Sequence, residues 1–125
     1  MSTLQWYAIR TVPIHRIEFS VGYELNQMAP ERAMVPSEIK WAKRRGSRAL
    51  RPVRYTIFPC YVFASFADVG EFFAAKAQIN KLAEAKGKKP PVVALVGYGS
   101  MPAVLSAGDV SLLQTLSRPE PTAQA

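Results

Sequence analysis

The segment Arg54-Tyr55-Thr56-Ile57-Phe58-Pro59-Cys60-Tyr61-Val62-Phe63-Ala64 joins the densest run of positive charge to the most strand-like part of the chain. Aromatic and β-branched residues are frequent from Tyr61 to Phe66, which predicts the central strand of a small sheet. Pro59 has no N–H to donate to a neighbouring strand, so pairing is expected to begin after it. Phe58 and Tyr61 flank this break. We expect their side chains to stay partly exposed and to meet a partner.

Length and composition indicate one ordinary globular domain. The chain has 125 residues, enough to bury a core, and its 49% hydrophobic and 20% charged residues are typical of a folded protein. Cys60 is the single cysteine, which excludes an internal disulfide and a multi-cysteine metal site and fits a reducing cytoplasm. Residues 1–5 lack the features of a signal peptide, and no apolar run approaches the roughly 20 residues that span a bilayer. We therefore expect a monomeric cytoplasmic protein without membrane contact.

The positive charge is concentrated in one segment. Residues 40–54 hold seven basic residues and no acidic one, while the rest of the chain carries nine of each sign. Such self-repulsion predicts a flexible loop. This loop can simply keep the protein in solution, or it can contact phosphate or an acidic protein surface. Trp41 within it can stack on a nucleic-acid base or cover the core, and the sequence does not decide between these roles.

Apolar spacing and turn residues predict an alternation of strands and helices. The expected order is strand 4–11, helix 13–28, strand 32–35, basic loop 40–54, strand 61–66, helix 69–86, strand 92–96 and helix 107–116. Asp68 and Ser106 are expected to cap the second and third helices. This order predicts an α+β fold, a four-stranded, largely antiparallel sheet flanked by three helices. We expect one domain over residues 1–118 and a disordered tail over 119–125.

The second helix carries two adjacent phenylalanines with different expected environments. Phe72 lies on the apolar face of that helix, together with Ala75, Ile79 and Leu82. Phe73 points about 100° away from that face. We expect Phe73 to be buried sideways, with a partner contact as the alternative.

Residues suited to catalysis are few. His15 is the single histidine and falls on the polar side of the first predicted helix, where a surface role is expected. Cys60 is expected to be a small packed residue; a reactive thiol is the alternative. The acidic residues are scattered, so they suggest neither a carboxylate pair nor a metal site. We expect a protein that is not an enzyme and needs no cofactor.

Four motifs, in this order and spacing, resemble the N-terminal domain of NusG-type transcription elongation factors, a likeness that covers residues 4–118. The motifs are Trp6-Tyr7-Ala8-Ile9, Met34-Val35-Pro36-Ser37-Glu38, Phe58-Pro59-Cys60-Tyr61-Val62-Phe63, and Val93-Ala94-Leu95-Val96-Gly97 followed by Met101-Pro102-Ala103-Val104-Leu105-Ser106. The expected element order agrees with the fold of that domain. The family commonly has glycine where this chain has Cys60.

The resemblance implies a factor that binds RNA polymerase at the clamp helices of the β′ subunit and reaches toward the β subunit. It implies a polymerase-binding set made of Arg10, Phe58, Pro59, Tyr61 and Phe63, with burial in the core as the equal alternative for Phe63. Phe72 and Phe73 extend that set, because they stand where specialised paralogs carry a polar motif that touches the β-subunit gate loop. The positive residues His15, Arg16, Lys43, Arg44, Arg45 and Arg48 are expected to face nucleic acid or the polymerase surface.

Family members usually continue into a KOW-type β-barrel that binds Rho or a ribosomal protein, and residues 1–125 contain no such segment. We therefore expect a stand-alone antitermination factor that competes with full-length NusG. The alternative is a nucleic-acid-binding module that grips RNA or DNA through residues 40–54.

Overall fold

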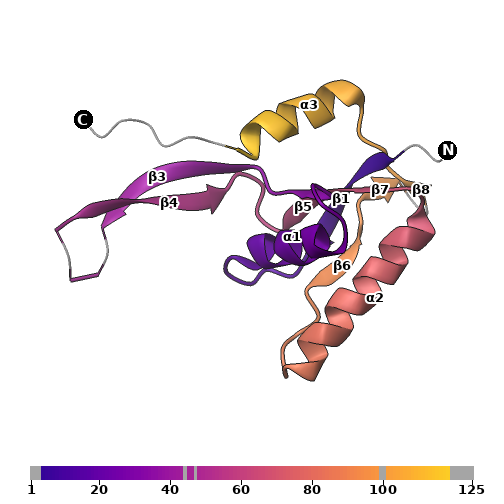
Figure 1. Ribbon diagram of the computed structural model, residues 1–125, viewed down its shortest axis with the longest axis horizontal. Helices are drawn as coiled ribbons and strands as arrows, with labels where there is room; N and C mark the ends of the chain where they lie inside the picture. Colours follow the sequence, from indigo (N-terminus) through magenta and orange to yellow (C-terminus); the bar gives the residue numbers. More distant parts are fainter. Residues whose placement is uncertain (1–3, 44, 47, 99–100, 119–125) are drawn as a thin grey trace.

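The computed structural model describes residues 4–43, 45–46, 48–98 and 101–118 (Figure 1). The predicted tail at 119–125 lies outside these residues. In chain order the elements are β1 (Gln5–Thr11), α1 (Ile17–Met28), β2 (Ala33–Met34), β3 (Ser37–Lys43), β4 (Leu50–Thr56), β5 (Tyr61–Phe66), α2 (Val69–Ala85), β6 (Val92–Leu95), β7 (Gly97–Tyr98), β8 (Met101–Pro102) and α3 (Ala107–Leu116). None of the described helices is long and apolar enough to cross a membrane.

The main sheet confirms the predicted α+β fold. It has four strands in the order β2-β5-β1-β6, and every neighbouring pair is antiparallel. β5 is central, as its run of strand formers predicted, and all its residues except Tyr61 are buried. Asp68 and Ser106 cap α2 and α3 by accepting the N–H groups of Glu71 and Asp109, which confirms both predicted caps.

Side-chain alternation divides the sheet into two faces with different covers. Tyr7 and Ile9 of β1 lie opposite Ala64 and Val62 of β5 on the first face, which packs against α1 and α2. Trp6 and Ala8 point to the second face, which packs against α3. Figure 1 shows α1 and α2 below the sheet and α3 above it.

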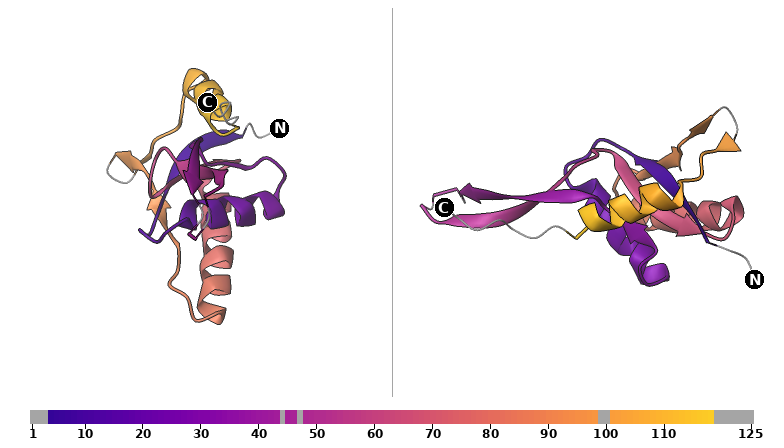
Figure 2. Two further views of the ribbon diagram at one scale, coloured as in Figure 1. Left: turned by 90° about the vertical axis from the view of Figure 1, so that its left-hand side faces the viewer. Right: turned by 90° about the horizontal axis from the view of Figure 1, so that it is seen from above.

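The basic segment is a β-hairpin, so the predicted flexible loop is wrong. β3 and β4 pair in register from Ser37–Thr56 to Lys43–Leu50, and Gly46 in the turn has φ 78°. Strand formers recur at alternate positions of both arms, and pleating separates the like charges on alternate faces. Figure 2 shows this two-stranded ribbon extending away from the rest of the molecule. We call β3, β4 and their turn the basic ribbon.

The first helix begins later than predicted. It starts at Ile17 rather than Pro13, because Arg16 takes a left-handed conformation with φ 61° at its N-terminal boundary. The extended chain of β1 also continues to Val12, whose N–H donates to the Pro91 carbonyl at 3.0 Å. Ile14, predicted on the apolar face of this helix, is consequently 45% exposed.

The remaining differences from the predicted elements each involve a few residues. Gly97, predicted in a turn, begins β7, and a side chain there would place its Cβ 2.1 Å from the Met101 carbonyl oxygen. Of the predicted buried strand at 92–96, β6 covers Val92–Leu95, and only Val92 is fully buried. Leu82, predicted on the apolar face of α2, is 42% exposed because the last turns of this helix extend beyond the sheet (Figure 1).

Both edges of the main sheet are closed by asparagine side chains. Asn26 of α1 accepts the N–H of Ala33 at 2.8 Å and donates to its carbonyl at 3.3 Å. Asn80 of α2 makes the same two bonds to Val92, each at 3.0 Å. Each carboxamide therefore imitates a further strand and satisfies edge groups that would otherwise pair with another chain.

We predict that Asn80→Ala lowers the free energy of unfolding by about 2 kcal/mol, because it leaves two buried backbone groups of Val92 without partners. Urea denaturation followed by circular dichroism measures the change. Gln78→Ala on the exposed side of α2 is the matched control and should stay within about 0.5 kcal/mol. Equal stability of the two variants would contradict this account of the edge.

Candidate functional site

The second face of the main sheet is only half covered. α3 lies over Trp6, Ala8, Met34 and Phe63, with Leu113 inserted among them. Farther along the same face, Arg10 and Tyr61 are paired neighbours on β1 and β5. Arg10 is exposed and Tyr61 is partly exposed. An aromatic ring and a guanidinium group therefore stand together where α3 ends its cover.

Phe58 extends this uncovered area. Its ring is 39% exposed and meets the ring of Phe63 edge-on, with centroids 5.7 Å apart and planes at 77°. Pro59 beside it is also exposed. We define Arg10, Phe58, Pro59 and Tyr61 as the aromatic patch. The sequence predicted all four, and the structure brings them to one end of the sheet.

The turn that presents the aromatic patch is held by a buried carboxylate. Glu18, 6% exposed at the start of α1, accepts the N–H of Cys60 at 2.7 Å. The Cys60 carbonyl in turn accepts the N–H of Thr11 at 2.8 Å. Cys60 has φ 70°, a conformation that favours glycine. The patch thus lies on a backbone that is fixed before any partner arrives.

Two other residues of the predicted polymerase-binding set belong to the core. Phe72 is 1% exposed and meets Phe66 edge-on at 5.7 Å, so it offers no surface to a partner. Phe63 is 8% exposed under α3 and supports Phe58 from below. The contact expected of Phe72 is therefore corrected to a packing role, because Phe72 packs from α2 against Phe66 of β5. For Phe63 the alternative of core burial holds, because α3 covers this ring.

Phe73 shows the opposite difference. The expected sideways burial is wrong, because 56% of this side chain is exposed. Its ring contacts the ring of Phe72, with centroids 5.3 Å apart. The alternative, a contact with a partner, stays a prediction.

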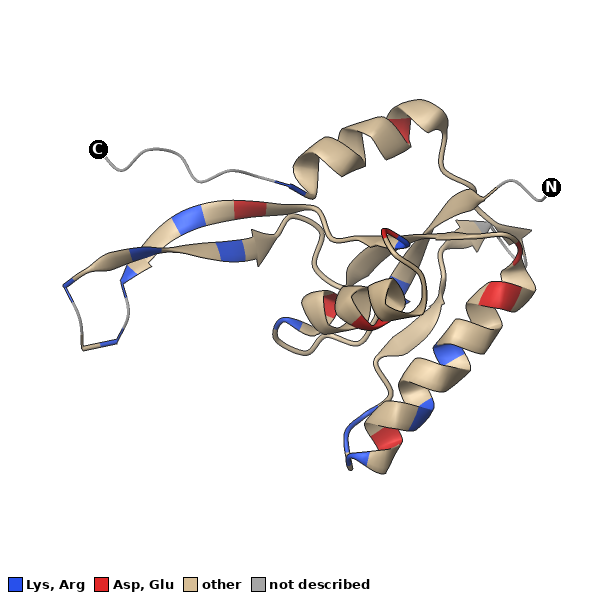
Figure 3. Ribbon diagram, viewed as in Figure 1, with Lys and Arg blue, Asp and Glu red and all other residues tan. Residues whose placement is uncertain are grey.

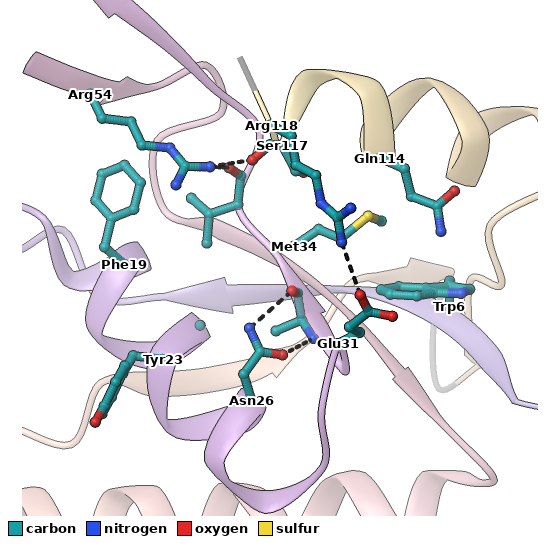
Figure 4. Close-up of a pocket in the computed structure, with 13 residues that line it drawn as sticks. Trp6, Phe19, Tyr23, Asn26, Glu31, Met34, Arg54, Gln114, Ser117 and Arg118 are labelled. Atoms are coloured by element: carbon teal, nitrogen blue, oxygen red, sulfur yellow. Dashed lines mark hydrogen bonds and ion pairs between the residues drawn. The ribbon is translucent and has the colours of Figure 1, made fainter. Parts of the chain in front are cut away.

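Arg54 connects the basic ribbon to the body of the protein (Figure 4). Its guanidinium donates to Ser37 Oγ, to the Val35 carbonyl and to the Ser117 carbonyl beyond the end of α3. The same group lies 5.5 Å from the ring centre of Phe19 on α1. Burial, and then the neighbouring charge of Arg16, lowers the pKa of Arg54.

Beside Arg54 lies an open pocket of about 910 Å³ between α1, β2 and the end of α3. Trp6, Tyr23 and Met34 line it, and an ion pair between Arg118 and Glu31 at 3.0 Å lies at its rim (Figure 4). The walls of this pocket mix apolar and charged side chains.

The predicted nucleic-acid-facing residues fall in two places. His15 and Arg16 lie in the turn before α1 and line a crevice of about 460 Å³ against β4. Lys43, Arg45 and Arg48 are exposed toward the far end of the basic ribbon. Arg44 lies outside the described residues. The basic side chains are coloured in Figure 3.

Sequence reasoning missed the roles of Glu18, Arg54 and the two edge asparagines. The sequence identified Arg54 only as one of seven charges in the basic segment. In the structure Arg54 on β4 pairs with Ile39 on β3. The strand pairing would have shown it on the more apolar face of the ribbon. No local signal marks Glu18, because its acceptor role depends on a turn 42 residues away.

Comparisons with known proteins leave the chain without an assigned family, because no family matches it and no curated protein does. Among the described residues, no group of three His, Cys, Asp or Glu side chains could hold a metal ion. The site is therefore characterised by its geometry, a preformed aromatic patch on an α+β domain and a separate basic ribbon.

We predict that Cys60→Gly raises the free energy of unfolding by about 1 kcal/mol, because it relieves the left-handed conformation of a residue with a Cβ. Urea denaturation measures the effect. Cys60→Ala is the matched control, since it removes the thiol but keeps the Cβ, and it should not be stabilised. Stabilisation by both substitutions would assign the effect to the thiol instead.

We predict that Arg54→Lys destabilises the protein by about 2 kcal/mol, because one ammonium group cannot replace three divergent guanidinium bonds. Amide hydrogen exchange should become faster in α3. Arg51→Lys, an exposed position on the same strand, is the control and should leave α3 unchanged. Unaltered exchange in α3 of the Arg54 variant would show that Arg54 does not hold this helix.

Proposed function

We propose that this protein is a non-enzymatic regulator of transcription elongation that binds RNA polymerase at the clamp helices of the β′ subunit. The observation that carries this proposal is the aromatic patch at the uncovered end of the sheet, where Arg10 lies opposite Tyr61 and the exposed Phe58 packs on Phe63. Aromatic and arginine side chains supply most of the energy of protein interfaces. The four motifs that resemble the NusG N-terminal domain support the choice of polymerase as partner.

The form of the patch suits a helical partner. α3 already packs a helix on the adjoining part of the same face, and the part beyond it presents Phe58 and Tyr61 for a further helix. Because Glu18 fixes the turn at Cys60, little ordering is needed on binding, and less of the interaction energy is lost. A pair of clamp helices laid beside α3 would cover Phe58 and Tyr61.

Phe73 would make a second contact with the polymerase. This side chain is exposed near the start of α2, whose first turn is capped by Asp68. We assign it to the gate loop of the β subunit, in place of the polar motif of the specialised paralogs. An apolar ring predicts a contact made by packing rather than by hydrogen bonds.

The proposed effect on transcription requires no chemistry. A protein that binds the closed clamp more tightly than the open clamp shifts polymerase toward its elongating state. Occupation of the clamp helices also excludes full-length NusG, which uses the same site. A factor that holds polymerase in its elongating state favours antitermination.

The second candidate function, nucleic-acid binding, is favoured by one observation, the exposed basic side chains of the ribbon. It uses a different surface from the aromatic patch. The two functions therefore make separable predictions, and variants of one surface should leave the other active.

We predict that the double substitution Phe58→Ala and Tyr61→Ala weakens binding to core RNA polymerase and to an isolated clamp-helix fragment by about 2–4 kcal/mol, because it removes both aromatic anchors. Isothermal titration calorimetry measures the affinities, after circular dichroism has shown that the variant is folded.

Tyr23→Ala is the matched control, because Tyr23 is 62% exposed on α1 and lies outside the aromatic patch. It should bind like the unaltered protein. Absence of polymerase binding, or equal loss in both variants, would refute docking through the patch.

A further inference from the structure

The basic ribbon is a projecting element with little packing of its own. Each arm has seven residues, and the views in Figures 1 and 2 agree that the ribbon extends beyond the main sheet. The exposed positions include Lys40 and Lys43 on β3, and Leu50 and Arg51 on β4. An isolated two-stranded ribbon is only marginally stable, so its length needs a reason other than stability.

The charge on the ribbon is positive and mostly unbalanced. From Ile39 to Ala67 the chain has no acidic residue. Glu38 at the base of the ribbon pairs with Lys40 at 3.2 Å, and among the described residues this is the only salt bridge of the ribbon. Lys43, Arg45, Arg48 and Arg51 keep their charges for a partner. Figure 3 shows these basic residues along both arms and at the turn.

The positive surface continues from the ribbon onto the body. His15, Arg16, Arg51 and Tyr55 line the crevice where the turn before α1 meets β4. The Arg16 side chain is oriented there, since it donates to the Arg54 carbonyl at 2.9 Å and lies 4.6 Å from the Phe19 ring centre. Among the residues that the structure describes, no carboxylate lines this crevice. Oriented cations without a carboxylate form a site for phosphate groups.

Basic side chains occur on both arms of one ribbon face. Lys40 of β3 lies opposite Val53, and Arg51 of β4 lies opposite Ala42, so Lys40 and Arg51 share a face but stand on different strands. The groove of a nucleic-acid duplex matches this arrangement, because one phosphate backbone runs along each side of the groove.

We propose that the basic ribbon inserts into the major groove of double-stranded DNA, with the crevice at its base holding the phosphate backbone beside the groove. The major groove of B-form DNA is about 12 Å wide and admits a two-stranded ribbon, whereas that of A-form RNA is too narrow. Single strands are normally held by exposed stacking rings. On this ribbon Trp41 is partly buried, and Tyr55, which is 39% exposed, has Lys40 at 5.8 Å from its ring centre. Among the described residues of the ribbon Tyr55 is thus the one exposed ring, whereas single strands stack successive bases on several rings. The geometry therefore favours duplex DNA.

The test measures fluorescence anisotropy with three labelled probes of one sequence, duplex DNA, single-stranded DNA and duplex RNA. We expect duplex DNA to bind tightest and to lose about two to three orders of magnitude in affinity between about 50 and 200 mM salt, as four to six phosphate contacts would give. Glucosylated 5-hydroxymethylcytosine, which fills the major groove, should block binding. Netropsin in the minor groove should not.

The ribbon variant carries Arg45→Gln, Arg48→Gln and Arg51→Gln and should reduce the slope of log affinity against log salt by about three. The matched control removes the same charge from the opposite end of the molecule, through Lys81→Gln, Lys88→Gln and Lys89→Gln, and should keep the slope. Thermal melting shows that both variants are folded.

Equal binding of all three probes, or equal loss in both variants, would overturn the proposal in favour of unspecific attraction. Preference for either single-stranded DNA or duplex RNA would overturn it in favour of that ligand. Absence of binding to all three probes would also overturn it and would indicate that the ribbon binds an acidic protein surface. The Phe58→Ala and Tyr61→Ala variant should bind DNA normally, so failure of polymerase docking and failure of DNA binding are distinguishable.

Discussion

The guanidinium group of Arg54 is the interaction that the arrangement of the domain depends on. It bonds to Ser37 within the basic ribbon and to the Ser117 carbonyl at the end of α3, while it faces Phe19 of α1. The carbonyl end of a helix carries partial negative charge, so the cation is favourably placed. Its burial beside Arg16 lowers its pKa, but an arginine remains charged at neutral pH. One side chain thereby ties together three elements that otherwise share few contacts.

The aromatic patch and the basic ribbon are held in place by different side chains, Glu18 and Arg54. The aromatic patch lies on β1, β5 and the turn before β5, and Glu18 holds that turn through Cys60. The basic ribbon extends away from the body, and Arg54 on β4 bonds to the Ser117 carbonyl. A protein of this design can hold one partner against its sheet and a second against its ribbon.

Much of the fold was predictable because local signals agreed with one another. The strand formers after Pro59 predicted β5, and Asp68 and Ser106 marked the starts of two helices. The break at Pro59 predicted that Phe58 and Tyr61 stay partly exposed, and the resemblance to the NusG N-terminal domain added Arg10 and Pro59 to the patch. Prediction failed for the basic ribbon, because repulsion among seven charges was weighed above the strand formers between them. It failed for Phe73 because burial depends on what lies beside a helix, which spacing along that helix cannot show.

The sequence by itself determined the strands of the main sheet, the three helices, the α+β class, most of the apolar faces and the concentration of positive charge in one segment. These follow from interactions between residues close together along the chain. Only the tertiary structure decided which rings stay exposed, since α3 covers Phe63 and leaves Phe58 open. Only the tertiary structure brought Glu18 to Cys60 and Arg54 to Ser117, because these partners are separated by 42 and 63 residues. Contacts at such separations depend on how the elements pack, and no local pattern records them.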